Sequence, residues 1–398
     1  MENNLNGNKM RVLILSCNTG GGHNSAGRAM ERRLKLEGQQ VTMLDIMSLA
    51  GERTSRMVGN TYINVAKYTP KLFHAAYMAG DFISSARRKS PVYYANVHMA
   101  RYLEDYLKTH PADILVMPHL FPAETITYMK RKGTLAVPAL AIATDYTCIP
   151  FWEETDCDGY VLPHPDLISE YVKKGIPEEK LYPLGIPNSM EFETKVTKEA
   201  AREALGLDSQ APLFLLMGGS MGFGKIRELA AELFSACRDG EQIAVICGND
   251  RKMEDSLREE FAGRERVYIL GYTNQVPLWL DACDVVYTKP GGLTSTEALV
   301  RQVPMIHTDP IPGCETKNAE FFSQRGMSVA EKSVTMQVET GKRLLWDTGL
   351  RDRMKKAQQE NSYPTASLEI YHLMRRMCGE QADQDCKNDS GTASRHLR

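Results

Sequence analysis

The sequence predicts an α/β protein with two doubly wound, Rossmann-like domains. Three observations predict this fold class. Short apolar runs alternate with segments of helical period, the runs fall into two series, and glycine-rich segments directly follow several of them. The 398 residues are enough for two domains, each with its own core.

The composition describes a soluble globular chain, with 42% hydrophobic and 25% charged residues. The formal net charge of -2 gives no reason to expect nucleic acid as a partner. The nine cysteines lack metal-like pairing, so we expect no disulfide framework and a cytoplasmic location. No signal peptide is visible, and no apolar run approaches the roughly 18 residues of a spanning helix. Any contact with a membrane is therefore expected from its surface.

The first series of apolar runs predicts an N-terminal domain over residues 9–187. Its expected strands are residues 10–16, 41–46, 113–118, 138–145 and 159–163. Runs without polar alternation are typical of strands that are buried on both faces of a parallel sheet. After the first run, Ser25–Gly38 places apolar residues at helical spacing and ends on a glycine.

The second series predicts a C-terminal domain over residues 201–345. Its expected strands are residues 212–220, 243–249, 266–272, 284–292 and 303–309. We expect a linker at residues 188–200 between the two domains. Helices at 346–378 are expected to pack back toward the N-terminal domain, and the polar tail at 379–398 is expected to be disordered.

The segment LSCNTGGGHNSAG (15–27) places Gly20, Gly21, Gly22 and His23 between the first strand and its helix. Three glycines let the backbone pass close to a ligand and leave free N–H groups at the helix start. An imidazole has an ordinary pKa near 6.5, which suits a base at neutral pH. A dinucleotide fingerprint fails, because Ser25 stands where its last glycine should be. The remaining alternative is a tight turn without a chemical role.

Three more glycine-bearing strand ends lie in the second domain. GGSMGFGKI (218–226) has P-loop spacing, but Ile226 stands where Ser or Thr should hold magnesium, which disfavours a nucleotide triphosphatase. TKPGGLTSTEAL (288–299) offers N–H donors to an anion and places Glu297 in the expected first helical turn, where its carboxylate suits both the helix dipole and a pair of sugar hydroxyls. IPGCETKN (311–318) adds Glu315 and Asn318. Each could be only a capped turn; together, without magnesium ligands, they predict a diphosphate-linked ligand.

Residues 53–98 do not fit a compact strand–helix unit. They hold seven Lys or Arg against one acid, Asp81, and seven aromatic residues. One interpretation is a helix at 69–80 that packs on its own domain. The other is an interfacial segment that docks on an anionic membrane. The residues expected at the membrane are Arg56, Lys67, Lys71, Phe73, Tyr77, Phe82, Arg87, Arg88 and Lys89.

Together these motifs resemble those of the monogalactosyldiacylglycerol synthases and processive diacylglycerol beta-glucosyltransferases, relatives of the lipid II N-acetylglucosaminyltransferase. The likeness runs from Met10 to about Met377. It implies a GT-B fold, in which two Rossmann-like domains face each other across a cleft. It also implies an inverting transfer of a hexose from a UDP-sugar to a hydroxyl of diacylglycerol or a glycosyl-diacylglycerol. Neither a cofactor nor a metal is implied, and the expected location is the inner face of the cell membrane.

The resemblance further implies roles for single residues. Gly20, Gly21 and Gly22 face the acceptor, His23 is the general base, and Asp145 in ATDYT (143–147) is a second candidate for that role. Cys314 replaces a glutamine of the family, which leaves the transferred hexose open. The residues implied to bind the donor are Gly219, Ser220, Gly222, Gly271, Tyr272, Gly292, Leu293, Thr294, Glu297, Glu315 and Asn318.

Two alternatives belong to other classes of function. A UDP-sugar 2-epimerase uses the same two-domain cleft, but it would not need the basic aromatic insert at 53–98. A non-catalytic UDP-sugar sensor would bind donor and a partner protein. The presence of His23 and of both donor carboxylates argues against the sensor.

Overall fold

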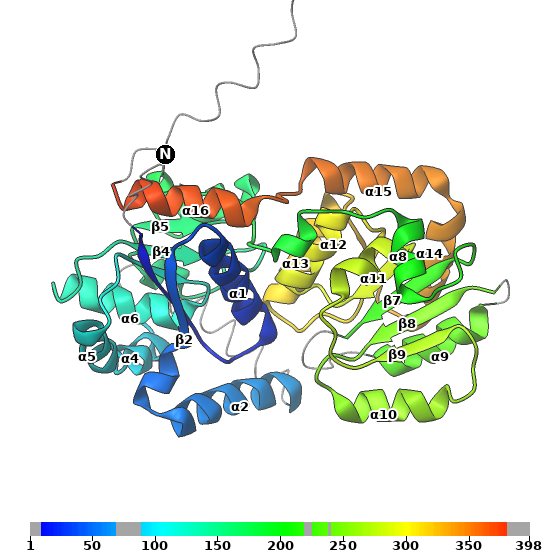
Figure 1. The fold of residues 1–398 in the computed structure, drawn as a ribbon, viewed down its shortest axis with the longest axis horizontal. Helices are drawn as coiled ribbons and strands as arrows, with labels where there is room; N and C mark the ends of the chain where they lie inside the picture. The colour runs from blue at the N-terminus through cyan, green and yellow to red at the C-terminus, as the bar shows by residue number, and fades with distance from the viewer. Residues whose placement is uncertain (1–8, 69–88, 219–224, 238–239, 380–398) are drawn as a thin grey trace, which may run out of the picture.

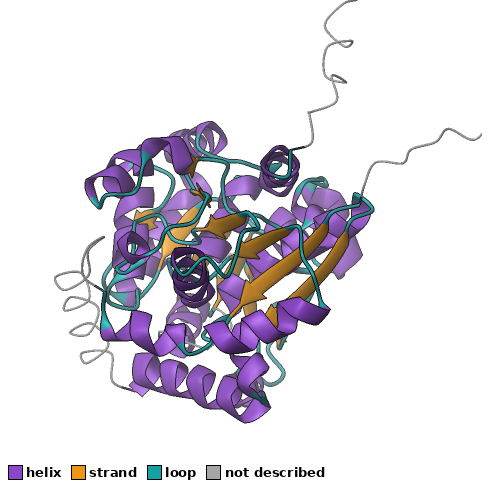
Figure 2. Cartoon of the chain, turned by 90° about the vertical axis from the view of Figure 1, so that its left-hand side faces the viewer, coloured by secondary structure: helices purple, strands orange, loops and turns teal. Residues whose placement is uncertain are grey.

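The computed structural model describes residues 9–68, 89–218, 225–237 and 240–379, which form two domains with one parallel six-stranded sheet each. Figure 1 shows the two halves side by side, and Figure 2 shows helices flanking the strands. The predicted fold class of two doubly wound domains is therefore confirmed.

The N-terminal sheet has the strand order β2-β1-β3-β4-β5-β6. The strands are β1 (Arg11–Ser16), β2 (Gln40–Asp45), β3 (Ile114–Met117), β4 (Ala139–Ile142), β5 (Gly159–Val161) and β6 (Leu181–Tyr182). After β2 the chain crosses to the other side of β1, so the order reverses between β1 and β3. Open α/β sheets bind ligands at such a switch point, outside the carboxyl ends of the strands.

The C-terminal sheet repeats this arrangement with the order β12-β11-β10-β7-β8-β9. Its strands are β7 (Leu213–Met217), β8 (Gln242–Ile246), β9 (Val267–Leu270), β10 (Val285–Thr288), β11 (Met305–His307) and β12 (Val329–Ala330). The switch point lies between β7 and β10. The sequence does not predict β6 and β12, because two-residue strands are too short to show a pattern.

The helices cover both faces of each sheet. Those of the N-terminal domain are α1 (Gly21–Leu36), α2 (Glu52–Tyr68), α4 (Pro91–Val97), α5 (Ala100–Thr109), α6 (Leu120–Arg131) and α7 (Ile168–Lys173). Those that follow are α8 (Lys198–Leu205), α9 (Ile226–Ala236), α10 (Arg251–Glu260), α11 (Val276–Ala282), α12 (Gly292–Arg301), α13 (Cys314–Gln324), α14 (Val334–Trp346), α15 (Thr348–Glu360) and α16 (Ala366–Met377). The helix expected at 69–80 lies outside the described residues.

Alternate residues of β1 enter different clusters, which explains why its run lacks polar residues. Leu13 and Leu15 pack in the cluster that contains Leu103 of α5. Val12 and Ile14 pack in a second cluster, with residues of α1 and α16. The strand is therefore buried on both faces, as all-apolar strands of parallel sheets are.

The last helix, α16, returns to the N-terminal sheet, whereas α15 stays on the C-terminal domain (Figure 1). The chain therefore crosses between the domains twice, and the two crossings touch. Gly185 of the first has a φ of 90° and lies so close to Tyr363 of the second that a Cβ would overlap it. Ser367 also donates a hydrogen bond of 2.7 Å to the carbonyl oxygen of Asn188.

Candidate active site

His23 lies in the first turn of α1, after β1. Its Nδ1 lies 2.9 Å from the carbonyl oxygen of Pro118 and 2.9 Å from Oγ1 of Thr144. A carbonyl can only accept a hydrogen bond, so we assign the ring proton to Nδ1. Nε2 of the neutral ring then carries the lone pair. The imidazole is thus oriented as a base by groups that follow β3 and β4.

The surroundings of His23 favour its neutral form. Burial lowers its pKa below the ordinary value of 6.5, while the charge of Asp145 and the hydrogen bond to Pro118 partly oppose this effect. The positive end of the α1 dipole also disfavours an imidazolium. His23 can therefore accept a proton at neutral pH.

A second histidine, His119, supports the first. The two rings meet edge to face with centroids 4.4 Å apart. Nδ1 of His119 accepts the N–H of Phe121 at 3.1 Å, so its proton lies on Nε2, which is 2.7 Å from Oγ1 of Thr19. Burial holds the pKa of His119 well below 6.5, so this ring stays neutral beside His23.

The N-terminus of α12 lies against the loop at Thr144, whose hydroxyl contacts the imidazole of His23. A Cβ at position 292 would overlap the carbonyl oxygen of Thr144, so only glycine allows this approach between the domains. A Cβ at Gly22 would lie 4.0 Å from Cβ of Leu293. The N-terminus of α12 thus adjoins the domain that carries the imidazole, and a helix N-terminus favours a bound anion.

Glu297 lies in the second turn of α12 rather than in the expected first turn. Its side chain is half-buried, and burial alone raises the pKa of its carboxyl to about 8. Thr294, three residues earlier, is also half-buried. A carboxyl that is mostly protonated at neutral pH can both donate and accept hydrogen bonds, as recognition of sugar hydroxyls requires.

Glu315 is engaged within the protein. It is buried, and its Oε1 pairs with the ammonium of Lys289, which follows β10. Its Oε2 accepts the N–H of Ile311 at 2.8 Å. The carboxylate therefore fixes the loop before α13 against the turn that precedes α12.

Asn318 joins the two domains at the edge of the same site. Its Oδ1 accepts the N–H of Tyr146 at 2.7 Å, and its Nδ2 donates to Oδ1 of Asp145 at 2.9 Å and to the carbonyl oxygen of Pro290 at 3.0 Å. The hydroxyl of Tyr146 lies 2.8 Å from Oγ1 of Thr296. Asp145, half-buried, is therefore held by the C-terminal domain while its charge acts on His23.

The structure brings together His23, Asp145, Gly22, Gly292, Leu293, Glu315 and Asn318. Gly20 caps α1, and Gly21 is the first residue of that helix. Gly271 follows β9, where a Cβ would overlap the Glu254 carboxylate, and neighbouring Tyr272 is 77% exposed. Gly219, Ser220 and Gly222 lie outside the described residues.

The predicted membrane contacts fall mainly outside the described part of the chain. Lys71, Phe73, Tyr77, Phe82, Arg87 and Arg88 lie there, and the side chain of Lys67 is likewise not described. Arg56 is exposed on α2. Lys89 is half-buried, and its ammonium donates to the carbonyl oxygen of Glu154 at 2.6 Å.

Sequence reasoning missed His119, Thr144, Tyr146 and Lys289. The motif VMPH (116–119) contained a usable signal, because it puts a histidine directly after a strand that we predicted. Thr144 and Tyr146 flank Asp145 in the ATDYT segment. Their pairing with distant helices has no signature in the sequence.

Within residues 9–68, 89–218, 225–237 and 240–379, no three His, Cys, Asp or Glu side chains gather in a way that could hold a metal ion. In that same part of the chain, no helix combines the length and apolar character that crossing a membrane requires.

Comparisons with known proteins match both halves of the chain. Residues 23–187 match the family model described as monogalactosyldiacylglycerol (MGDG) synthase, and residues 197–361 match the one described as glycosyl transferases group 1. The processive diacylglycerol beta-glucosyltransferase of Staphylococcus carnosus is 26% identical over 371 residues, 92% of this chain and 93% of that protein. The protein of the same name from Bacillus subtilis is 28% identical over 360 residues, 88% and 91% of the two chains.

Solved structures show the same fold at low sequence identity. MurG of Acinetobacter baumannii superposes with a TM-score of 0.61 at 16% identity, covering 92% of this chain and 99% of that one. Anabaena Alr3699/HepE in complex with UDP-glucose gives 0.52 at 12% identity, covering 92% and 100%. The protein is thus a glycosyltransferase of the GT-B fold that resembles the diacylglycerol glycosyltransferases along most of its length.

Proposed function

We propose that the protein transfers a hexose from a UDP-sugar to a hydroxyl of diacylglycerol, or of a glycosyl-diacylglycerol, with inversion at the anomeric carbon. One observation carries the proposal. A neutral imidazole, His23, has its proton fixed on Nδ1 and lies beside the contact between the N-terminal loop at Thr144 and the anion-favouring end of α12 at Gly292.

In the proposed reaction, Nε2 of His23 takes the proton of the acceptor hydroxyl as the oxygen bonds to the anomeric carbon. The bond from that carbon to the UDP oxygen breaks on the opposite side, and UDP leaves. General base catalysis of this kind contributes about 10²–10⁴-fold. Single displacement on an α-linked UDP-sugar gives a β-linked product, and the curated relatives are named beta-glucosyltransferases.

Negative charge develops on the leaving diphosphate, and the N-terminus of α12 is the group we propose to stabilise it. Thr294 then contacts the phosphates and Glu297 the ribose, while the loop at Glu315 and Asn318 holds the hexose. The donor assignment draws support from Alr3699/HepE, which shares this fold and whose structures contain UDP or UDP-glucose. No metal enters the proposed step, and activity that survives EDTA is the expected result.

The proposed acceptor is a membrane lipid, reached from the inner face of the cell membrane by peripheral contact. The names of the relatives and the basic, aromatic composition of residues 53–98 support it. Sedimentation with anionic liposomes tests the membrane contact.

The deciding experiment incubates the protein with radiolabelled UDP-glucose, UDP-galactose or UDP-N-acetylglucosamine and diacylglycerol, followed by lipid extraction. Label in the lipid phase is expected with one of the three donors. Conversion of the donor to its 2-epimer without lipid labelling would identify an epimerase instead. UDP binding with neither reaction would identify a sensor.

His23→Ala should lower kcat by about 10²–10⁴-fold while the Kd for UDP changes little, because the base touches only the acceptor. His110→Ala is the matched control, since His110 is exposed at the end of α5. Equal losses of turnover and UDP affinity in His23→Ala would show that His23 is structural.

A further inference from the structure

A groove in the N-terminal domain, separate from the contact between the domains, has no role in the reaction described above. It has a volume of about 1070 Å³ and lies among α2, α4, α5 and α6. This volume slightly exceeds the roughly 300–1,000 Å³ that is usual for small-molecule sites. We propose that this groove binds an acyl chain of the lipid acceptor, an inference that rests on the proposed function.

The walls of the groove suit an unbranched hydrocarbon. The buried Met47 and Met99 line it, together with the half-buried Val58, Val97 and Phe121. Methionine and valine side chains offer no hydrogen bond that a hydrocarbon would leave unmade. Removing methylene groups from water is favourable in proportion to the area covered.

One lining residue of the groove also packs against the histidine pair that includes the proposed base. Phe121 lines the groove, and its ring meets His119 edge to face at 4.7 Å between centroids. His119 in turn meets His23 at 4.4 Å. The reacting hydroxyl of a diacylglycerol is on the same glycerol as its acyl esters. An acyl chain in the groove would therefore lie on the Phe121 side of the pair of packed histidine rings that ends at His23.

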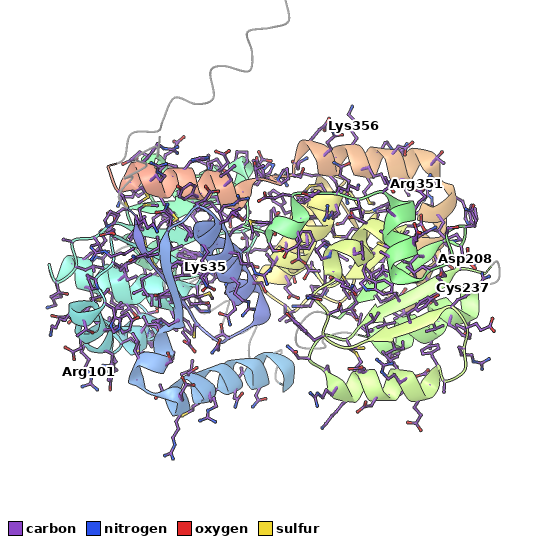
Figure 3. All side chains as sticks on the ribbon, in the orientation of Figure 1. Lys35, Arg101, Asp208, Cys237, Arg351 and Lys356 are labelled. Atoms are coloured by element: carbon purple, nitrogen blue, oxygen red, sulfur yellow. The ribbon has the colours of Figure 1, made fainter. Side chains whose placement is uncertain are left out.

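The groove lining holds two cations, which suit a lipid that enters from an anionic membrane, and one acid, Glu104. Arg101 and Lys132 line the groove, and each cation lies over an aromatic ring, Tyr102 at 4.5 Å and Tyr128 at 5.7 Å. Figure 3 shows Arg101 at the outer edge of the N-terminal half. Cations above apolar surface suit the boundary between anionic headgroups and acyl chains.

Direct occupancy is tested without relying on catalysis. Val97→Trp places an indole in the groove, and Val172→Trp places one on the exposed side of α7 as the matched control. Diacylglycerol with brominated acyl chains, presented in detergent micelles, should quench the fluorescence of the indole at position 97 more strongly than that at position 172. Equal quenching of the two variants overturns the proposal, whatever the protein transfers.

Kinetics supply the second test. Val58→Glu puts a charge into the groove wall and should lower the ratio of kcat/KM for long-chain over short-chain diacylglycerol by about tenfold. Val172→Glu should leave that ratio unchanged. An unchanged ratio in Val58→Glu overturns the acyl-chain site while leaving the proposed transfer intact. A protein that transfers to no diacylglycerol at all yet shows quenching at position 97 refutes the proposed function instead.

A second copy of the chain is the competing occupant. Sedimentation velocity of the wild type and of Val58→Glu shows whether a second copy binds there, because it measures the oligomeric state of each. A dimer that the charge dissociates would assign the groove to self-association and overturn the proposal; a monomer in both samples is the expected result.

Discussion

The protonation state of His23 depends on groups from two other strand ends, those of β3 and β4. Pro118 and Thr144 fix the tautomer, burial disfavours the charged ring, and Asp145 partly offsets that effect. A histidine in this environment remains a base below the pH at which a free histidine would be half protonated.

The pH dependence of Asp145→Asn separates the two candidate bases. Removing the negative charge lowers the pKa of His23 further, so the acidic limb of kcat/KM should move to lower pH while substantial activity remains. The measurement is kcat/KM against pH for the wild type and the variant. Complete loss of turnover in Asp145→Asn, with the Kd for UDP retained, would make Asp145 the base.

Stability against pH tests the environment of Glu297. Its folded pKa of about 8 exceeds the ordinary 4.5, so between these values the folded state holds a proton that the unfolded chain has lost. The free energy of unfolding that this group contributes therefore falls as pH rises through the window. Relative to Glu297→Gln, the wild type should lose stability between pH 5 and about pH 8 in urea titrations. A difference that does not vary with pH contradicts this.

The glycine segment and its histidine could be predicted because both follow a run with a strong strand pattern. The partners of His23 could not, since Pro118 and Thr144 are 95 and 121 residues away in the chain and only the sheet brings them together. Gly292 shows a subtler limit. The sequence indicates N–H donors for an anion there, but not that the backbone of the other domain lies against this glycine. Glu315 shows the same limit, because its pairing with Lys289 depends on how two loops fold over one another.

The first residues of α12 must meet two structural requirements at once. Its N–H groups must remain available to an anion, and Gly292 must admit the carbonyl oxygen of Thr144. Neighbouring Gly291 has ordinary contacts, with Glu315 and Lys289 atoms 3.7 Å from a Cβ, and a φ of −72° that any residue adopts.

Gly292→Ala should therefore be far more disruptive than Gly291→Ala. The added methyl forces α12 away from the Thr144 loop, and overpacking of this kind costs about 1–3 kcal/mol of unfolding free energy. Turnover should fall with it, because the base and the anion-favouring helix end separate. Urea titration and lipid-labelling assays of both variants check the prediction. Similar behaviour of the two alanine variants would mean that the domains do not make this contact in solution.

The two domains are held together by buried polar contacts as well as by apolar surface. Asn318 makes three hydrogen bonds, to Tyr146, Asp145 and Pro290, and it is fully buried. Arg325, directly after α13, adds an ion pair at 2.7 Å with Asp166 of the N-terminal domain. These contacts fix how His23 faces the donor side.

Asn318→Ala should weaken the contact between the two domains more than the small size of the lost side chain suggests. Buried groups such as the N–H of Tyr146 lose their partners, and each such loss costs about 1–3 kcal/mol. We expect a lower urea midpoint and a larger radius of gyration in small-angle scattering, as the domains spend more time apart. Asn249→Ala, on an exposed turn, is the control. A wild-type midpoint in Asn318→Ala would remove this residue from the junction.

The touching crossings at Gly185 and Tyr363 have a mechanical consequence. Because the two connecting segments touch each other, we expect them to act as one hinge. The two domains can then open about this hinge, whereas twisting or sliding of one domain against the other is resisted. They also make the first half dependent on the far end of the chain, because α16 completes its core. A fragment that stops at the linker would thus expose the apolar face of the N-terminal sheet that α16 covers. A separate peptide with the sequence of α16 should bind this face and restore the stability of the fragment.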